Sequence, residues 1–416
     1  MSEEMKNLNN EPEKAPVEKK PLDKKTLGII IGAVAAVLVI VLVLVLALGG
    51  NQTPETPDDG GEQGGEQGGN GEENNPPVLN DYTLGLGVVV NLDSSETALA
   101  EVDATVATVV LDKDGKIVAC RLDVAQNKVD VTDGFVTVPG SFKTKMELGS
   151  AYGMGQAEIT EANKWMDNNG DGRVLEWNEQ AKAFEAWCVG KTVAQVEALG
   201  AEENLQNANN HWFTKDEDLL SAGCTIQIGD FVGAVVKACN DEFKVSFQSE
   251  GNFTLGLGVD SYDDGSVDAD AENGTVMVYS DMAAVVIDNG IIVASLNDAI
   301  QPKISFDVAG EITAKTFNGT KRELKEGYHM GQAEITEANK WMDNNGDGKV
   351  YEWYVQSAAF SAHIVGKTAA DVESMPTQTL KNGYVISNDQ DLLAAGCTIQ
   401  ISAIVDVVVE AAANAR

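Results

Sequence analysis

The pattern of hydrophobic and polar positions first predicts two β-hairpins. Residues 104–124, ATVATVVLDKDGKIVACRLDV, form two runs rich in β-branched residues around Asp114-Gly115. Further along, AAVVIDNGIIVASL has the same pattern around Asn289-Gly290. Asp-Gly and Asn-Gly favour the tight type I′ turns that join antiparallel strands. We therefore expect one hairpin of this kind at each place.

An amphipathic helix is predicted after the first hairpin, beginning near Val174. Its apolar positions recur at spacings of three and four: Val174, Trp177, Ala181, Phe184 and Cys188. Gly190 is expected to end this helix. Thr192 and Gln195 then form a capping-box pattern, which predicts a shorter helix reaching Leu199.

These elements occur twice because the chain contains a tandem repeat. MGQAEITEANKWMDNNGDG is identical at Met154 and Met330, and TLGLGV, VGKT and AGCTIQI also occur in both copies. Each copy ends in an apolar helix, FVGAVVKA or AIVDVVVEAAA. The predicted fold class is α+β: two tandem homologous domains, residues 81–248 and 249–416, each an antiparallel sheet with helices on one side, preceded by a single transmembrane helix.

The N-terminal region predicts a membrane anchor. Residues 27–48, LGIIIGAVAAVLVIVLVLVLAL, are uncharged and long enough to cross a bilayer as a helix. Lysines precede this run, whereas residues 51–80 carry seven acidic and no basic side chains. Residues 1–26 should therefore be a cytoplasmic tail, 49–80 a disordered acidic stalk, and the rest extracytoplasmic, giving a single-pass protein of the cell membrane. A cleaved signal peptide is the alternative, for which the apolar run is too long.

Charge and cysteine content exclude some classes of function. The formal net charge of −36 argues against nucleic-acid binding, which requires a basic face. The five cysteines are scattered and form neither a disulfide framework nor a CxxC pair. We expect buried free thiols.

Several other motif matches carry no chemistry. GLGLG lacks the third glycine of a dinucleotide-binding fingerprint, and VGKT closes a predicted helix where a phosphate loop would open one. No combination of nucleophile, base and orienting group emerges, so no catalytic residue is predicted. The tryptophans that flank the acidic loop are expected to belong to the core: Trp165, Trp177, Trp341 and Trp353.

The DNNGDG stretch in each copy resembles the first half of an EF-hand calcium loop. Calcium takes about six to eight oxygen ligands, and alternate side chains of such a loop point inward. The resemblance implies Ca²⁺ binding, with Arg173 and Lys349 contributing only their carbonyl oxygens. The candidate metal ligands are Asp167, Asn169, Asp171, Arg173 and Glu176 in the first copy, and Asp343, Asn345, Asp347, Lys349 and Glu352 in the second.

Both loops depart from the EF-hand pattern at the closing position. Asn178 and Tyr354 stand where the family has a bidentate glutamate, and the only acid shared by the copies is Glu176 or Glu352, two positions earlier. On a helix beginning near Val174, that acid would point about 200° away from the closing position. Two interpretations stay open: a calcium loop closed differently, by these glutamates or by water, or a turn rich in Asn, Asp and Gly for backbone reasons.

The order of elements in each copy is similar to that of the FMN-binding domain of bacterial envelope flavoproteins. The similarity covers the Gly-rich first strand, the hairpin, the helices and AGCTIQI before the last helix. In that family a threonine hydroxyl carries FMN as a phosphoester, and the matching residues are Thr225 and Thr398. The upstream acids, Asp218 and Asp391, lie seven residues before the threonine, where the family has six. A flavin-free relative in which CTIQI is a buried strand is the alternative.

Two hypotheses on function follow. The first is a membrane-anchored extracytoplasmic electron carrier with one FMN in each domain and a redox partner outside the membrane. The second is a calcium-stabilised, non-redox surface protein whose domains bind a ligand. An enzyme is the weakest interpretation, because no catalytic group is predicted.

Overall fold

The computed structural model describes residues 78–416, except residues 168, 169, 171, 209, 271, 344, 345 and 347. The predicted tail, transmembrane helix and stalk up to residue 77 lie outside this part. Within it, no helix is both long enough and apolar enough to cross a membrane. Asn75–Arg416 forms one compact unit. The α+β class is confirmed, whereas a division into two separate domains is not.

The first repeat builds a four-stranded antiparallel sheet in the order β3-β2-β1-β6. Leu99 pairs with Asp130 and Leu111 with Ile117, so the predicted hairpin is confirmed. The strands are β1 (Asn80–Asn91), β2 (Leu99–Asp112), β3 (Ile117–Asp130) and β6 (Val245–Ser249).

The second repeat builds an antiparallel sheet around the long strand β8. β7 pairs with one edge of β8, while β9 and β10 share the other edge. The strands are β7 (Thr254–Asp263), β8 (Gly274–Asp288), β9 (Ile291–Ile300), β10 (Lys303–Phe306) and β11 (Ile312–Thr316).

The two hairpin turns differ from each other. Asn289 and Gly290 both have positive φ, 51° and 80°, as a type I′ turn requires. In the first hairpin Gly115 has φ 75°, but the connection covers residues 113–116 and is not the predicted type I′ turn. Asp112 stabilises this wider loop, because its Oδ1 accepts N–H bonds from Asp114 and Lys116 at 2.9 and 2.8 Å.

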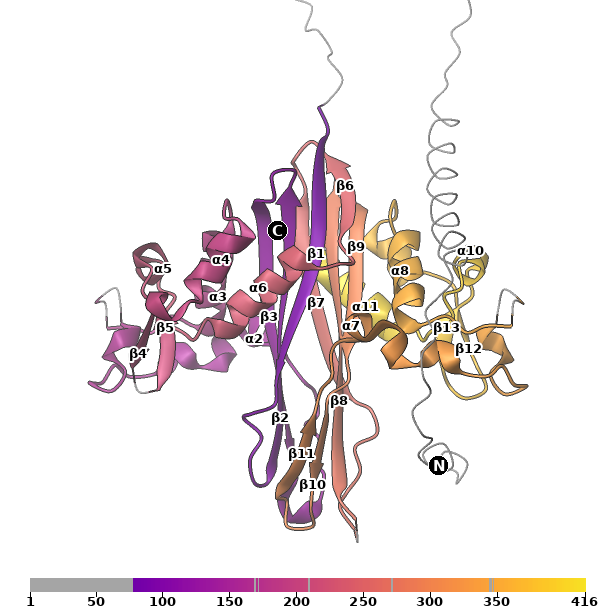
Figure 1. The fold of residues 1–416 in the computed structure, drawn as a ribbon, viewed down its shortest axis with the longest axis horizontal. Coiled ribbons are helices and arrows are strands. Elements are labelled where there is room, and N and C mark those ends of the chain that lie inside the picture. Colours follow the sequence, from indigo (N-terminus) through magenta and orange to yellow (C-terminus); the bar gives the residue numbers. More distant parts are fainter. Residues whose placement is uncertain are drawn as a thin grey trace, which may run out of the picture. The chain divides into compact units, whose positions relative to one another are not determined.

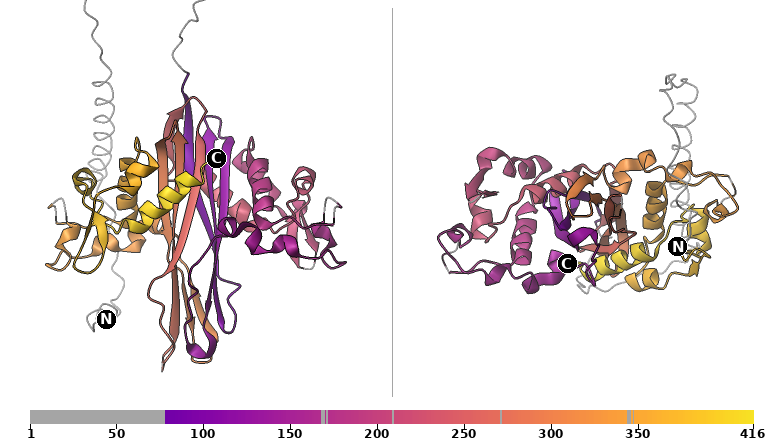
Figure 2. Two further views of the ribbon diagram at one scale, coloured as in Figure 1. Left: turned by 180° about the vertical axis from the view of Figure 1, so that it is seen from behind. Right: turned by 90° about the horizontal axis from the view of Figure 1, so that it is seen from below.

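The two sheets pack face to face and share one hydrophobic core (Figures 1 and 2). Helices cover the outer face of each sheet, as predicted, while the inner face meets the sheet of the other repeat. Because both faces are covered, β2 is buried along almost its whole length. The shared core includes Leu84, Leu86 and Val88 of the first repeat and Leu255, Leu257 and Val259 of the second.

One long helix in each repeat lies unusually close to its sheet. A Cβ atom built on Gly85 would stand 2.0 Å from the carbonyl oxygen of Ala238, and one on Gly256 would stand 1.8 Å from that of Ala411. The glycines of TLGLGV therefore serve helix packing inside strands β1 and β7. The long helices are α3 (Trp177–Cys188) and α6 (Gly229–Asn240) on the first sheet, and α8 (Trp353–His363) and α11 (Ser402–Ala413) on the second.

The smaller elements confirm one prediction and correct another. Thr192 and Gln195 form the predicted capping box of α4 (Val193–Leu199). Residues 224–228, CTIQI, are not a strand; they form an irregular segment in which Cys224, Ile226 and Ile228 are buried. The other short helices are α2 (Lys145–Leu148), α5 (Glu217–Ser221), α7 (Lys321–Leu324), α9 (Ala369–Glu373) and α10 (Gln390–Ala394), and two small hairpins pair β4 (Leu205–Ala208) with β5 (His211–Thr214) and β12 (Thr377–Thr379) with β13 (Val385–Ser387).

Single 3₁₀ turns make up much of the connection before α3 and before α8. Three of them, η3 to η5, recur as η7 to η9 in the second repeat, and the last two of these lie in the stretch of identical sequence. The turns are η2 (Thr132–Gly134), η3 (Gly149–Tyr152), η4 (Met154–Gln156), η5 (Lys164–Met166), η6 (Glu202–Asn204), η7 (Lys325–Tyr328), η8 (Met330–Gln332) and η9 (Lys340–Met342).

A buried ion-pair network links the repeats. Arg322, 5% exposed, lies between Asp298 of its own repeat and Asp241 of the other. Its Nη2 atom is 2.9 Å from Asp241 Oδ2, and its Nε atom is 3.2 Å from Asp298 Oδ2. The repeats are therefore joined by charge as well as by the apolar core.

Candidate functional site

The acidic loops begin with an aspartate that folds back on its own backbone. Asp167 Oδ2 accepts the N–H of Gly172 at 3.1 Å, and Asp343 Oδ2 accepts that of Gly348 at 3.0 Å. This bond spans five residues and draws the ends of the loop together. Four of the predicted ligands lie outside the described residues: Asn169, Asp171, Asn345 and Asp347.

The shared glutamates lie just before a helix, not within one. α3 begins at Trp177 and α8 at Trp353, so Glu176 and Glu352 are N-cap residues with extended backbone, φ −62° and −60°. The predicted helix start near Val174 is wrong. The 200° argument against these glutamates therefore does not apply, because no helix fixes their direction.

Each glutamate carboxylate packs under a glycine of the preceding 3₁₀ turn. A Cβ atom on Gly155 would stand 2.8 Å from Glu176 Oε1, and one on Gly331 would stand 2.9 Å from Glu352 Oε1. The glycine thus makes room for the carboxylate. Both copies keep this arrangement.

Four carboxylate oxygens of the loops are shielded from solvent but have no hydrogen-bond partner among the described residues. They are Asp167 Oδ1, Glu176 Oε2, Asp343 Oδ1 and Glu352 Oε2. Shielded carboxylate oxygens are costly unless a donor or a cation meets them. The described side chains include no group of three or more His, Cys, Asp or Glu placed to hold a metal. The four shielded oxygens are of the kind that binds a hard cation. The carbonyls of Arg173 and Lys349 were also predicted ligands, and the contacts of these two residues do not test that role.

Beside each loop lies a pocket, and the two pockets are built from equivalent residues. Their volumes are about 550 Å³ in the first repeat and 280 Å³ in the second. Their walls include residues of the 3₁₀ turns before the acidic loop and the first residue of the helix after it. The shared lining is Lys145, Tyr152, Met154, Trp165, Met166, Trp177, Ile226 and Gln227, matched by Lys321, Tyr328, Met330, Trp341, Met342, Trp353, Ile399 and Gln400.

A lysine lies against the aromatic rings of each pocket. Lys145 Nζ is 5.1 Å from the ring centre of Tyr152 and 5.6 Å from that of Trp177. In the second repeat, Lys321 Nζ is 5.3 Å from Tyr328 and 5.2 Å from Trp353. These cation–π contacts hold each lysine in place at the pocket wall.

Carboxyl groups outnumber the lysine in both pockets. Asp103 and Asp230 line the first, and Asp264 and Asp281 line the second. Burial, followed by repulsion from Glu101, raises the pKa of Asp103 to about 6. Burial also raises the pKa of Asp230 and of Asp281. The pockets therefore favour a neutral or cationic ligand over a dianion.

Tryptophan side chains form part of the wall of the first pocket. Trp165 stacks on Phe213 with ring centres 4.7 Å apart, and its indole Nε1 is shielded without a partner in the described part of the chain. Trp177 and Trp353 are 3% and 4% exposed, so they belong to the core as predicted. Trp165 and Trp341 are half-buried and serve chiefly as pocket walls.

Thr225 and Thr398, the predicted FMN attachment residues, are buried. Each is 1% exposed, and each hydroxyl donates to a glutamine Oε1, from Thr225 to Gln180 at 3.2 Å and from Thr398 to Gln356 at 3.1 Å. The same oxygens accept the threonine N–H groups. In this arrangement the hydroxyls do not fit a phosphoester, although Thr398 borders its pocket.

All five cysteines are buried and free, as predicted. Burial raises the pKa of Cys224 and of Cys397 to about 12. The thiols beside Thr225 and Thr398 are therefore protonated at neutral pH and unreactive.

Sequence reasoning missed the lysine and the tyrosine of the pocket. Lys145 and Lys321 follow Thr144 and Thr320, which cap α2 and α7. The available signal was the recurrence of Thr-Lys and of Tyr eight positions after that threonine in both copies.

Comparisons with known proteins found no match. No family model, no curated protein and no solved structure matches this chain.

Proposed function

We propose that this protein is an extracytoplasmic, membrane-anchored binding protein that holds one planar aromatic ligand in each repeat. The observation that carries the proposal is the recurrence of the same lysine, tyrosine and two tryptophans at equivalent places of the pocket wall in both repeats. Flat ring systems stack favourably on tryptophan and tyrosine. The free Nε1 of Trp165 adds a donor for a ring carbonyl or nitrogen.

Riboflavin and FMN make a matched pair of probes because they share one ring system and differ in a phosphate. Riboflavin is neutral, so we expect it to bind at two sites per chain, measured by quenching of its fluorescence on the full chain. FMN should bind about tenfold more weakly, roughly 1.4 kcal/mol, because its phosphate meets the excess carboxylates. No binding of either probe would contradict the proposal.

Trp165→Ala combined with Trp341→Ala tests the pocket itself. Both residues are half-buried pocket walls, so we expect riboflavin binding to weaken at both sites. Trp187→Ala is the matched control, because Trp187 packs on Phe184 and does not line the pocket. Equal weakening in the control would show that the effect is not local.

Calcium binding by the acidic loops completes the proposal. The shielded oxygens of Asp167 and Glu176, and of Asp343 and Glu352, support it. With a partly hydrated coordination shell, the affinity should lie at roughly 0.1–1 mM. Because residues on both sides of the loop form the pocket wall, calcium should also increase riboflavin affinity by about fivefold.

Calorimetric titration of the full chain with Ca²⁺ tests this part. The heat should disappear in the double variant Asp167→Ala/Asp343→Ala and remain in Glu158→Ala/Glu334→Ala, which removes two exposed acids of the same repeated segment. A titration that is unchanged in the first variant would remove calcium from the proposal.

A flavin-bearing electron carrier is the second candidate function. It is favoured by the position of Thr398 at the wall of the second pocket and of Ile226, next to Thr225, at the wall of the first. It requires both threonine hydroxyls to leave the glutamine oxygens to which they donate. The test is visible flavin absorbance of the full chain made together with its natural modifying enzyme. A coloured protein that loses its colour in Thr225→Ala/Thr398→Ala would establish the carrier, and a colourless protein would leave the binding protein.

A further inference from the structure

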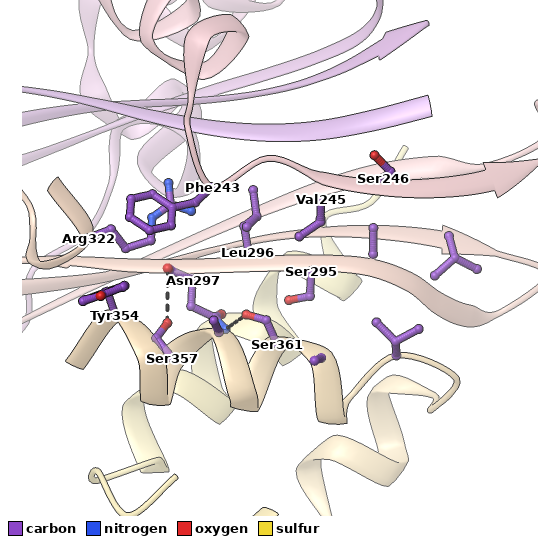
Figure 3. A pocket seen from close by; sticks show the side chains of 15 residues that line it. Phe243, Val245, Ser246, Ser295, Leu296, Asn297, Arg322, Tyr354, Ser357 and Ser361 are labelled. Atoms are coloured by element: carbon purple, nitrogen blue, oxygen red, sulfur yellow. Dashed lines mark hydrogen bonds between the residues drawn. The ribbon is translucent and has the colours of Figure 1, made fainter. Parts of the chain in front are cut away.

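The second repeat has another cavity on the side of its helix α8 that faces strand β9. Figure 3 shows it between α8, β9 and the segment from Phe243 to Ser246. Its volume is about 370 Å³, within the usual range for small-molecule sites. It shares none of its lining with the aromatic pockets. The apolar part of its wall is formed by Val245, Val293, Leu296, Ala358, Ala362 and Val365.

Two buried polar side chains in this wall lack partners. Ser295 and Asn297 are each 2% exposed. Asn297 Nδ2 donates to Ser361 Oγ at 2.7 Å, but Asn297 Oδ1 and Ser295 Oγ have no hydrogen-bond partner among the described residues. A buried acceptor without a donor is unfavourable, so these atoms call for a ligand group that can donate a hydrogen bond.

The charges around the cavity favour a neutral ligand. Arg322 reaches the cavity, and its Nη1 also lacks a hydrogen-bond partner within the described chain. Its positive charge is already met by Asp241 at 2.9 Å and Asp298 at 3.2 Å. An anionic ligand would therefore add a third negative charge to one guanidinium, whereas a hydroxyl or amide oxygen can accept from Nη1 without that penalty.

The first repeat does not repeat this site. Leu122 pairs with Ala107 as Asn297 pairs with Ala283, so a leucine stands where the second repeat has asparagine. Glu185 takes the place of Ser361, since the two residues lie equally far along the chain from the repeated methionines Met154 and Met330.

The glutamate at this position is already bonded to its neighbours. Glu185 Oε1 accepts the N–H of Leu122 at 2.9 Å, and Glu185 Oε2 is 2.6 Å from an Arg416 guanidinium nitrogen. The two repeats thus differ in what lies between the helix and the outer strand.

We propose that the cavity between α8 and β9 is a binding site, specific to the second repeat, for an uncharged small molecule with a compact aliphatic body and a hydroxyl or amide group. The aliphatic body packs on the valine, leucine and alanine side chains. The polar group donates to Asn297 Oδ1 or Ser295 Oγ and accepts from Arg322. This site is independent of the aromatic pockets and of calcium.

Cyclohexanol is a suitable probe, measured by saturation-transfer NMR with the full chain in lipid nanodiscs. Cyclohexyl methyl ether keeps the ring and the oxygen but has no donor, and cyclohexanecarboxylate adds a negative charge. We expect cyclohexanol to bind saturably and both comparison compounds to bind at least about fivefold more weakly, as loss of one hydrogen bond predicts. Absence of saturable binding by cyclohexanol would mean that the cavity holds water only and would overturn the proposal.

Matched variants locate the binding. Ala362→Phe fills the cavity from the exposed side of α8, and Ala186→Phe makes the same change at the equivalent, also exposed position of α3. Cyclohexanol affinity should fall at least about tenfold in the first variant and stay unchanged in the second. Asn297→Leu, which introduces the residue of the first repeat, should weaken cyclohexanol and leave the ether unchanged. Equal affinity in Ala362→Phe and the unaltered chain, or equal binding of alcohol and ether, would overturn the proposal.

Discussion

The two repeats agree at their aromatic pockets and differ between the helix and the outer strand of each sheet. Lys145 and Lys321 make the same contacts with tyrosine and tryptophan rings. By contrast, Leu122 and Glu185 of the first repeat correspond to Asn297 and Ser361 of the second. The shared positions surround the acidic loop, whereas the differing positions surround the cavity of α8. The two proposals follow this contrast: one ligand type held twice in the similar pockets, and a second ligand held once in the cavity of α8.

The same contrast appears in the buried charges. Asp123 and Asp298 are equivalent, because each accepts an N–H bond from the second residue of a short capped helix, α2 or α7. That residue is Met146 in the first repeat and Arg322 in the second. Asp298 therefore has a cationic partner and Asp123 has none at this position.

Replacement of Arg322 should give the largest effect on stability. Arg322→Met introduces the residue of the first repeat and leaves the carboxylates of Asp241 and Asp298 buried without their cation. Loss of one partner from a buried ion pair costs about 3–5 kcal/mol. Urea unfolding followed by circular dichroism should show one transition at lower urea, because the repeats share a core.

Lys325→Met is the control for this variant. Lys325 pairs with Glu242 at 2.6 Å, but both side chains are substantially exposed, 37% and 59%. Exposed pairs contribute less than about 1 kcal/mol. A loss in Lys325→Met equal to that in Arg322→Met would mean that burial does not distinguish the two pairs.

The close helix approach should give an intermediate effect that is equal in the two repeats. Gly85→Ala and Gly256→Ala each place a Cβ within about 2 Å of a helix carbonyl, so α6 or α11 must move outward. Overpacking of this kind costs about 2–3 kcal/mol. Thermal unfolding of the two single variants measures both losses. Clearly unequal losses would mean that the repeats are not equivalent at this contact. Gly115→Ala cannot serve as a control, because Gly115 has a positive φ that alanine disfavours.

A further prediction concerns pH. Burial raises the pKa of Asp123 from 3.8 to about 7, so the folded chain keeps this proton to a higher pH than the unfolded chain. The free energy of unfolding should therefore fall as the pH rises from about 4 to about 7. Asp123→Asn removes this fall and should be more stable than the unaltered chain at pH 8, with no difference near pH 4.

Asp298→Asn sharpens the comparison. Burial raises the pKa of Asp298 too, but the Arg322 guanidinium opposes the rise. The gain at pH 8 should therefore be smaller than for Asp123→Asn when both are measured by urea unfolding. Equal gains would mean that Arg322 does not stabilise the charged form of Asp298.

Local chemistry explains which parts of the fold were predictable. Asn289-Gly290 and the Thr192 capping box depend on neighbouring residues alone, and both predictions are confirmed. The start of α3 depends on the carboxylate of Glu176, which packs against Gly155 some 20 residues earlier. The spacing of apolar residues carries no information on that contact, so the helix was predicted to begin too early.

The candidate site was predictable only in part for a similar reason. DNNGDG carries a recognisable ligand spacing within a few residues, which drew attention to the loop. The aromatic pocket is lined by residues from β2, α2, the 3₁₀ turns, α3 and α6, and its lysine belongs to no recognised sequence motif. The packing of the two sheets against each other was likewise not predicted, because it joins residues of the two repeats that lie far apart in the sequence.

The shared core has a consequence for how such a chain could arise. A polypeptide with one repeat would expose the sheet face of Leu84, Leu86 and Val88, an apolar surface that water disfavours. Such a polypeptide would bury that face by pairing with a copy of itself as a homodimer. Gene duplication followed by fusion would join the two partners covalently, and their sequences would then no longer have to be identical. Once fused, one half can gain an arginine or an asparagine that its twin does not need.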